Sequence, residues 1–406
     1  MTDRGPFIQM PELPPLEQHP GASQDPGPGD LGLVMGGGGA RAAYQIGFLR
    51  CAARLFPNLR IPYVTGVSAG AINTALLASH HGTFIQAVEE LTQLWANLRV
   101  DDVFRTDTLS LIMNLWRWGI ALISGGNVDS KHARSLVDTQ PLRAYLEDVL
   151  HSVNGEITGI SYNLETGRLK AAAISTSRYS TGRSITWVQG NDVDPWERPH
   201  RRSRAAVLTV DHVMASTALP LFFPAVELED GWHGDGSVRL TAPLSPALHL
   251  GARRIIAVST RYQRSNTKAD APVVRGYPPP AQVGGALMNA VFLDLLDQDA
   301  MEIERVNALL ASLPEEKRIG LRPVKLLILR PSVDLGKLAY RYEAQLPRAF
   351  RFLTRGLGTR DTQSSDLLSF ILFQPNFLRA LMELGDRDAT ARADEIEAFI
   401  EAEALE

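Results

Sequence analysis

Two glycine-rich turns near the start of the chain constrain its fold more than any other feature. Each turn lies between an apolar, strand-like run and a helical pattern. The segments are Leu31–Met35, 36–41 and Ala42–Arg54 around the first turn, and Ile61–Thr65, 66–70 and Ala71–His81 around the second. Strands that alternate with helices predict a layered α/β fold.

Further apolar runs along the chain predict additional strands. They lie at Leu169–Ser175, Ser184–Gln189, Arg254–Ser259 and Val324–Leu329. Continuous apolar strands separated by helices are typical of a parallel sheet that is buried on both faces. We therefore expect a mainly parallel central sheet covered by helices.

The composition is that of a soluble globular protein, because 45% of the 406 residues are hydrophobic and 21% are charged. The net charge of −4 gives no broad basic field, so we expect no nucleic-acid partner. Cys51 is the only cysteine, which excludes an internal disulfide and a cysteine-based metal cluster. Its place in an apolar helical pattern predicts a buried side chain.

Four segments are expected along the chain. Residues 1–29 are rich in proline and have no apolar core of a secretory signal, so they predict a disordered leader. Residues 30–265 would form the main domain, 266–281 a loop or linker, and 282–406 a mostly helical extension packed on the core. The strand predicted at Val324–Leu329 would rejoin the main sheet.

The sequence predicts no transmembrane helix. The longest apolar run, Leu109–Ser124, is interrupted by Asn114 and Arg117 and is too short to span a bilayer. It is either a buried helix or an amphipathic surface element. Because no secretory signal is visible either, we expect a cytoplasmic protein or one at the periphery of a membrane.

The second turn has the pattern of a nucleophile elbow. Gly66-Val67-Ser68-Ala69-Gly70 fits G-x-S-x-G, in which a serine lies on a strained turn between a strand and a helix. Small neighbours are needed there, because bulky side chains would collide with the flanking strand and helix. A chance turn is the alternative, but the position after a strand and before a helix favours a catalytic Ser68.

The first turn places several main-chain N–H groups at the start of a helix, where unpaired donors and the helix dipole stabilise negative charge. The same residues approximate the dinucleotide fingerprint, which requires an acidic residue about 20 positions later. No Asp or Glu lies between Asp30 and Glu89, so we expect no cofactor. Arg41 could stabilise an anion, hold the loop by an ion pair, or be a solvated arginine.

A serine nucleophile needs a group that takes its proton. Among the acidic residues, Asp235 is the best candidate for this group, because glycines on both sides let the backbone turn sharply and bring the carboxylate close to another loop. An ordinary Asp-Gly turn explains the same residues. A Ser-His-Asp triad is the general expectation, with His233 and His249 as candidates, yet neither stands out. His249 lies near the predicted end of a helix, where a histidine favours capping.

Together these motifs resemble those of the bacterial members of the patatin-like phospholipase family. Segment 37–41 resembles the glycine-rich oxyanion loop of that family, 66–70 its nucleophile elbow, 215–220 the stretch before its catalytic acid, and 235–236 its D-G-[AG] motif. The extension to Glu406, in which the polar stretch 364–366 leads into 367–370, is also similar to that of bacterial members. The resemblance implies a three-layer α/β/α fold with a helical C-terminal extension.

The resemblance also implies which residues act. Patatin-like enzymes use a Ser–Asp dyad without histidine, so Ser68 would be the nucleophile and Asp235 its proton acceptor. The implied oxyanion hole consists of the amides of Gly37, Gly38 and Gly39 with Arg41 assisting, and the supporting glycines are Gly66, Gly70 and Gly236. Two residues depart from the family pattern. Ala42 replaces a glycine, and Ser237 has a hydroxyl that could bind Asp235 and lower its basicity.

We therefore expect a lipid acyl hydrolase of the phospholipase A or lysophospholipase type, which acts on a fatty-acyl ester without a metal or cofactor. The basic run 198–204 either attracts anionic lipid headgroups or is a solvated loop. The alternative function is that of a non-catalytic lipid-binding or regulatory protein that retained the fold. In that case Ala42 and Ser237 would be marks of lost activity.

Overall fold

The computed structural model describes residues 29–105, 135–191, 193–263, 279–292, 295–346, 351 and 366–402, and all structural statements below concern these residues. The apolar run Leu109–Ser124, the predicted leader up to residue 28 and residues 266–278 of the predicted linker lie outside them. None of the described helices is both long and apolar enough to cross a membrane.

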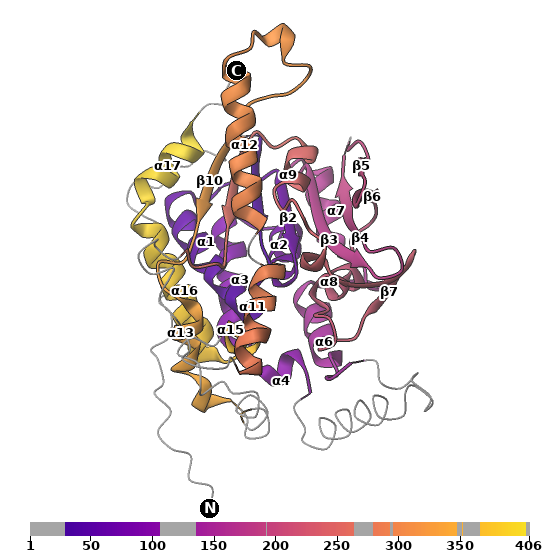
Figure 1. Cartoon of the computed structure of the whole chain (residues 1–406), viewed down its shortest axis with the longest axis vertical. Helices are drawn as coiled ribbons and strands as arrows, with labels where there is room; N and C mark the ends of the chain where they lie inside the picture. Colours follow the sequence, from indigo (N-terminus) through magenta and orange to yellow (C-terminus); the bar gives the residue numbers. More distant parts are fainter. Residues whose placement is uncertain are drawn as a thin grey trace, which may run out of the picture.

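A mixed sheet of ten strands forms the centre of the described structure (Figure 1). The strands are β1 Leu31–Met35, β2 Tyr63–Val67, β3 Ala171–Arg178, β4 Arg183–Gly190, β5 Glu197–Arg198, β6 Arg201–Ala205, β7 Val226–Leu228, β8 Gly231–Asp235, β9 Arg254–Val258 and β10 Lys325–Leu329. Their order is β10-β9-β1-β2-β3-β4-β6-β5, and the β7–β8 hairpin joins through β8 beside β3.

The predicted parallel sheet is confirmed in the half that runs from β10 to β3. Every predicted strand is present, with small shifts at the ends, and β10 rejoins the sheet beside β9. The other half is different, because β3 pairs antiparallel with both β4 and β8. The strands β5 to β8 were not predicted, since they are short and lack a continuous apolar run.

Helices lie on both faces of the sheet, as Figure 1 shows. The α-helices are α1 Ala43–Leu55, α2 Ala69–Ser79, α3 Phe84–Asn97, α4 Val100–Val103, α6 Gln140–Val149, α7 Thr158–Glu165, α8 Val210–Thr217, α9 Ser245–Leu250, α11 Pro280–Phe292, α12 Leu295–Ala311, α13 Leu335–Tyr340, α15 Asp366–Ile371, α16 Pro375–Thr390 and α17 Ala393–Glu401. Strand β1 explains the layering, because Leu33 and Met35 enter the core formed with α1, α2, α3 and α16. Val34 faces the opposite core with α9 and α12.

The last helices of the chain pack directly on the first. In Figure 1, α16 and α17 lie along one side of the sheet, and α16 crosses α1 at a pair of glycines. A Cβ atom at Gly47 would overlap the main-chain oxygen of Met382. A Cβ atom at Gly385 would lie 3.1 Å from the Cα atom of Gly47 and would overlap the main-chain oxygen of Tyr44. The two helices therefore touch backbone to backbone. Cys51, on α1, is buried as predicted.

Candidate active site

Ser68 lies in the turn between β2 and α2, with φ +54° and ψ −134°. A residue other than glycine adopts such a backbone conformation only where its surroundings impose it. A Cβ atom at Gly66 would overlap the main-chain oxygen of Gly70, and one at Gly70 would overlap those of Met35 and Gly36. These close approaches explain why glycine stands on both sides of the serine.

The sheet brings Asp235 to this turn although the sequence separates the two residues widely. Val67, just before Ser68, pairs with Ser175 of β3. Further along the same edge of β3, since β4 occupies the other edge, Asp235 of β8 pairs with Thr176, the residue after Ser175. The end of β2, which leads into Ser68, and the end of β8, which carries Asp235, therefore meet along one edge of β3. Both side chains are buried, with exposed fractions of 1% and 0%.

The Asp235 carboxyl is in an unusual state for an acidic side chain. Burial raises the pKa of Asp235 to about 7, against the opposing effects of the Ser68 hydroxyl and of Ser237. The Oδ1 atom accepts a hydrogen bond from the main-chain N–H of Ser237 at 2.9 Å. Among the described residues, no donor meets Oδ2 with ordinary hydrogen-bond geometry. Asp235 is thus a carboxyl group close to the Ser68 hydroxyl and able to exchange a proton near neutral pH.

Ser216 of α8 holds the turn that carries Ser68 in place. Its hydroxyl accepts a hydrogen bond of 2.9 Å from the Ser68 N–H and donates one of 2.7 Å to the main-chain oxygen of Ser175. Ser216 is fully buried, so these bonds are shielded from water. The link fixes the distance between the serine turn and β3, the strand with which Asp235 of β8 also pairs.

The first glycine turn lies beside Ser68. Gly38 and Gly39 have φ values of +148° and +56°, and Gly38 is the N-cap of a 3-10 helix over Gly39–Ala42. No side chain caps this helix, and the first N–H groups of any helix have no intrahelical acceptor. Thr260 supports the turn by donating a hydrogen bond of 2.8 Å to the main-chain oxygen of Gly37.

Arg41 is buried, with an exposed fraction of 3%, so it is not the solvated arginine that the sequence left open. Its guanidinium forms an ion pair of 2.7 Å with Asp366 and donates a hydrogen bond of 2.7 Å to Ser369. It also lies 4.3 Å from the ring centroid of Phe370. Arg41 therefore ties the glycine turn to α15, and its assistance to an oxyanion stays a prediction.

A narrow apolar cavity opens at Ser68 and Gly39. Aliphatic and aromatic side chains from α2, α3, α4, α6 and α15 line it, among them Ile72, Trp95 and Phe370. Its volume is about 40 Å³, which is room for only a few water molecules. The residues of α15 close one side, because a Cβ atom at Gly39 would overlap the main-chain oxygen of Phe370.

The structure brings neither candidate histidine to Ser68. His233 is fully buried, and its ring nitrogens lie 2.9 Å from Thr176 Oγ1 and 2.7 Å from Asp230 Oδ1. His249 is in the last turn of α9, where its ring stacks on Trp196 at 4.7 Å. Both imidazoles thus have other partners. Among the described residues, His, Cys, Asp and Glu side chains form no group of three or more that could hold a metal ion.

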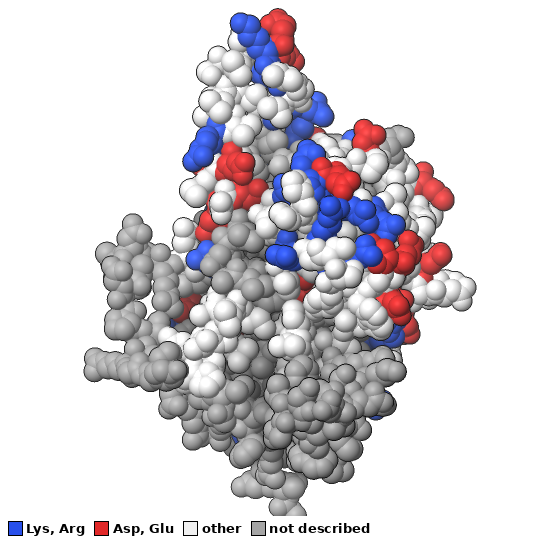
Figure 2. Space-filling view, turned by 45° about the vertical axis from the view of Figure 1, so that its right-hand side comes forward, with Lys and Arg blue, Asp and Glu red and all other residues white. Residues whose placement is uncertain are grey.

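The basic run 198–204 is part of the sheet and not a solvated loop. It comprises the last residue of β5, the turn of the hairpin and most of β6. Asp230 Oδ2 lies 3.6 Å from Arg202 and 3.0 Å from Arg204, and 3.5 Å from Arg178 on β3. On the face seen in Figure 2, Lys and Arg side chains gather next to Asp and Glu side chains. Part of the basic charge is therefore used to hold the β7–β8 hairpin.

A family model described as "Patatin-like phospholipase" matches residues 33–248, more than half of the chain. The chain belongs to the patatin-like phospholipase family. The matched segment contains both glycine turns, Ser68 and Asp235, and the three-layer arrangement with a mostly parallel sheet and a helical C-terminal region is the fold of this family. Membership supports lipid hydrolysis at the level of the family.

Two of the solved structures that match this chain are only distantly similar to it. VipD from Legionella pneumophila is 13% identical with a TM-score of 0.33, and the alignment covers 91% of this chain and 75% of that one. Human GIVD cytosolic phospholipase A2 in complex with methyl gamma-linolenyl fluorophosphonate is 12% identical with a TM-score of 0.46. The alignment covers 91% of this chain and 58% of that one. These values are too low to bear on the activity. The search of curated proteins found no match.

Several residues at the site had no role in the sequence analysis. Ser216 lies within the quoted segment 215–220, but nothing in that segment indicates a bond to Ser68. Asp366, Ser369 and Phe370 belong to the stretch 364–370 that resembles bacterial members, but they lie beyond the segment that the family model matches, and nothing in that stretch indicates a contact with Arg41. Only the buried state of Arg41 could have indicated a partner, because a buried guanidinium requires one.

Proposed function

We propose that this protein is a lipid acyl hydrolase in which Ser68 attacks the carbonyl carbon of a fatty-acyl ester. The observation that carries the proposal is the meeting of Ser68, on a strained turn, with a buried carboxyl group whose pKa is about 7. A general base works best when its pKa lies near the working pH, and Asp235 satisfies that condition. An unperturbed aspartate, with a pKa near about 4, would be a weak base for a hydroxyl.

In the first step, the Ser68 oxygen bonds to the ester carbon while Asp235 accepts the hydroxyl proton. The carbonyl oxygen becomes an oxyanion, which the N–H groups of Gly37, Gly38 and Gly39 stabilise. Main-chain N–H groups that have no other acceptor commonly form such an oxyanion hole. The tetrahedral intermediate then releases the alcohol, which takes the proton from Asp235. The products of this step are the free alcohol and an acyl ester of Ser68.

In the second step, Asp235 takes a proton from water, and the resulting hydroxide attacks the acyl carbon. The fatty acid leaves as Ser68 regains its proton from Asp235, so the enzyme returns to its starting state. The apolar cavity beside Ser68 would hold the acyl chain. Because its volume is about 40 Å³, the aromatic side chains that line it must move apart when a long chain enters.

The experiment that tests the proposal combines active-site labelling with lipid hydrolysis. The wild-type protein is expected to react with a fluorophosphonate probe and to release fatty acid from phosphatidylcholine in mixed micelles. Ser68→Ala should abolish both signals, whereas Ser312→Ala, at an exposed serine after α12, should leave both unchanged. If the wild-type protein neither reacts nor releases fatty acid, the protein is a lipid-binding relative without activity, and the proposal is wrong.

A second comparison separates the dyad from a triad. Asp235→Asn should abolish hydrolysis of a p-nitrophenyl ester, while His249→Gln should leave the rate near that of the wild type, because His249 is stacked on Trp196 and does not contact Ser68. Loss of activity in His249→Gln with activity retained in Asp235→Asn would contradict the dyad.

A further inference from the structure

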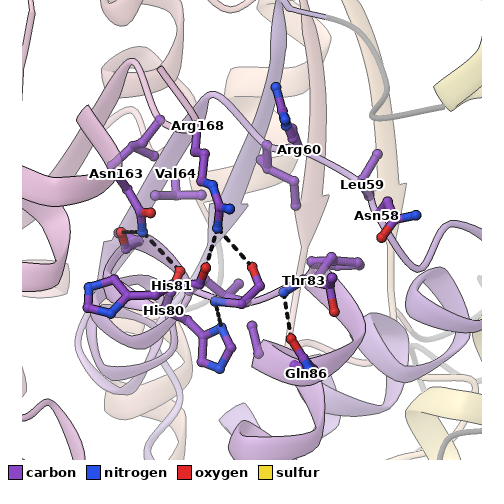
Figure 3. Close-up of a pocket in the computed structure, with 17 residues that line it drawn as sticks. Asn58, Leu59, Arg60, Val64, His80, His81, Thr83, Gln86, Asn163 and Arg168 are labelled. Atoms are coloured by element: carbon purple, nitrogen blue, oxygen red, sulfur yellow. Dashed lines mark hydrogen bonds between the residues drawn. The ribbon is translucent and has the colours of Figure 1, made fainter. Parts of the chain in front are cut away.

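A second cavity lies at the opposite end of α2 from Ser68 (Figure 3). The helix begins at Ala69, next to Ser68, and its last turn supplies Leu77 and Ala78 to the cavity wall. A helix of 11 residues is about 16 Å long, so the two sites are separate. The cavity holds about 400 Å³, within the roughly 300–1,000 Å³ typical of small-molecule sites.

Three loops form this cavity at the amino edge of the parallel strands. They are residues 58–61 before β2, residues 80–83 between α2 and α3, and residues 167–170 before β3. The parallel register of β2 and β3 places their amino ends together, just as it places Ser68 and Asp235 near their carboxyl ends. The cavity and the proposed active site therefore lie at opposite edges of the parallel strands and are separate.

The floor of the cavity is apolar and its rim is cationic. Val64, Leu77, Phe84 and Leu169 supply the floor, and Arg60 and Arg168 stand on the rim. In Figure 3 these two arginines lie above His80 and His81. No Asp or Glu is among the residues that line this cavity. A ligand with an apolar part and a negative charge fits both features.

The two arginines differ in how firmly they are held. Arg168 donates hydrogen bonds through one terminal nitrogen to the main-chain oxygens of His81 and Gly82, so its guanidinium is fixed over the cavity. Arg60 is exposed, and among the described residues no ion pair involves it. One cation is thus preorganised and the other is available to a ligand.

Of the two histidines on this rim, His80 adds little charge at neutral pH. Burial lowers the pKa of His80, whose Nε2 atom lies 3.3 Å from Glu90 Oε2. The His81 ring packs edge-on against Tyr162 with 4.7 Å between the ring centroids. Arg60 and Arg168 are the side chains of this rim that carry a positive charge at every physiological pH.

We propose that this cavity binds a single-chain amphiphile with an anionic head. Its tail would lie on Val64, Leu77, Phe84 and Leu169, and its head between Arg60 and Arg168. A purely polar anion would leave the apolar floor exposed to water. A neutral lipid would offer the two arginines no negatively charged group. The two sources of this chemistry are a fatty acid, with a carboxylate head, and a lysolipid with a phosphate head.

The inference is independent of the proposed function, because it needs only charge and apolar contact and not a reactive Ser68. The test uses the full chain carrying Ser68→Ala, so that a failure of the hydrolase proposal would not affect it. A decanoate that carries a diazirine on its tail is cross-linked by light, and the labelled peptides are mapped. Label in residues 58–61, 77–87 and 163–169 is the expected result. Label only in the peptides of the Ser68 cavity, such as 217–223 and 370–373, would overturn the inference.

Competition and variants sharpen the test. Decanoate and decyl phosphate should displace the probe while decanol should not, and the stronger of the two anions identifies the head. Equal displacement by decanol would show a merely apolar site and would contradict the inference. Arg60→Gln should weaken binding about tenfold, the scale of a charge-assisted contact near the surface. Arg60→Lys should retain most of it.

Arg168→Gln could also loosen the loop that it supports, so it is compared with Arg168→Lys, which keeps the charge. The control for net charge is Arg322→Gln with Arg341→Gln, which removes two exposed arginines elsewhere. This control should bind the probe as the parent protein does. If it weakens binding as much as Arg60→Gln combined with Arg168→Gln, the effect is one of overall charge and the site is refuted.

Discussion

The two ends of α2 carry cavities of opposite character. At its start, Ser68 and Asp235 are buried, the cavity is narrow and apolar, and burial raises the pKa of the Asp235 carboxyl to about 7. At its end, the cavity is roughly ten times larger and has two arginines on its rim. Proton transfer needs burial to change the pKa of a carboxyl group, whereas binding by charge works with exposed arginines. One helix thus joins a site suited to chemistry and a site suited to recognition.

The largest expected difference between the two ends is in catalysis. Ser68→Ala and Asp235→Asn should each lower kcat/KM for a p-nitrophenyl ester by on the order of 10³-fold or more, since the nucleophile and its base are removed. Arg60→Gln, at the other end, should leave kcat/KM within about twofold in the absence of an amphiphile. Steady-state kinetics measure both. A large loss in Arg60→Gln would show that the two ends are not independent.

The second prediction concerns pH. Because burial raises the pKa of Asp235 to about 7, its carboxyl is protonated below that pH and cannot accept the Ser68 proton. Activity should therefore fall as the pH is lowered through 7, by about 100-fold between pH 8 and pH 5. The variant Arg60→Gln should give the same profile. A kcat/KM that does not change over this range would rule out Asp235 as the base.

The third prediction tests the link between the glycine turn and α15. Asp366→Asn leaves the buried Arg41 guanidinium without its carboxylate, so it should lower kcat/KM about tenfold and also reduce Tm, because an unpaired buried charge is costly. Glu395→Gln makes the same change in the exposed pair with Arg392 and should alter Tm little. Equal Tm values for the two variants would show that the ion pair of Arg41 with Asp366 does not stabilise the fold more than an exposed pair does.

The smallest effect is expected from the walls of the cavities. Phe370→Ala enlarges the cavity at Ser68 and should shift the preference among p-nitrophenyl esters toward longer or bulkier acyl chains by a few fold in KM. Leu77→Ala, at the other cavity, should leave the chain-length preference unchanged. A shift of the same size in Leu77→Ala would mean that the acyl chain does not occupy the cavity beside Ser68.

Much of the fold follows from the sequence because periodicity reports burial directly. The strands from β10 to β3 were predicted, since each is an apolar run buried on both faces. The strands β5 to β8 were not, because a hairpin such as Val226–Asp235 is stabilised by pairing with β3 and not by its own apolar pattern. Local sequence carries no record of such long-range pairing.

The same limit applies to the candidate site. Ser68 and the glycine turn stand out because their backbone conformations are unusual, and Asp235 stands out because its neighbour Gly236 lies against the main chain of β3. The partners of these residues need no special backbone, so Ser216 and Asp366 look ordinary in the sequence. The pKa of Asp235 could not be predicted either, because its burial depends on α8 and β3 together. The cavity at the end of α2 has no motif, since three separate loops form it.

The glycine crossing of α1 and α16 has a consequence for how this protein can vary. A gain of one methyl group at Gly47 or Gly385 cannot be absorbed by a side chain that rotates away, because the obstacle is main chain. A larger residue at either glycine therefore requires the other helix to move away. In homologues with a larger residue at one of these two positions, we expect α1 and α16 to lie further apart at the crossing.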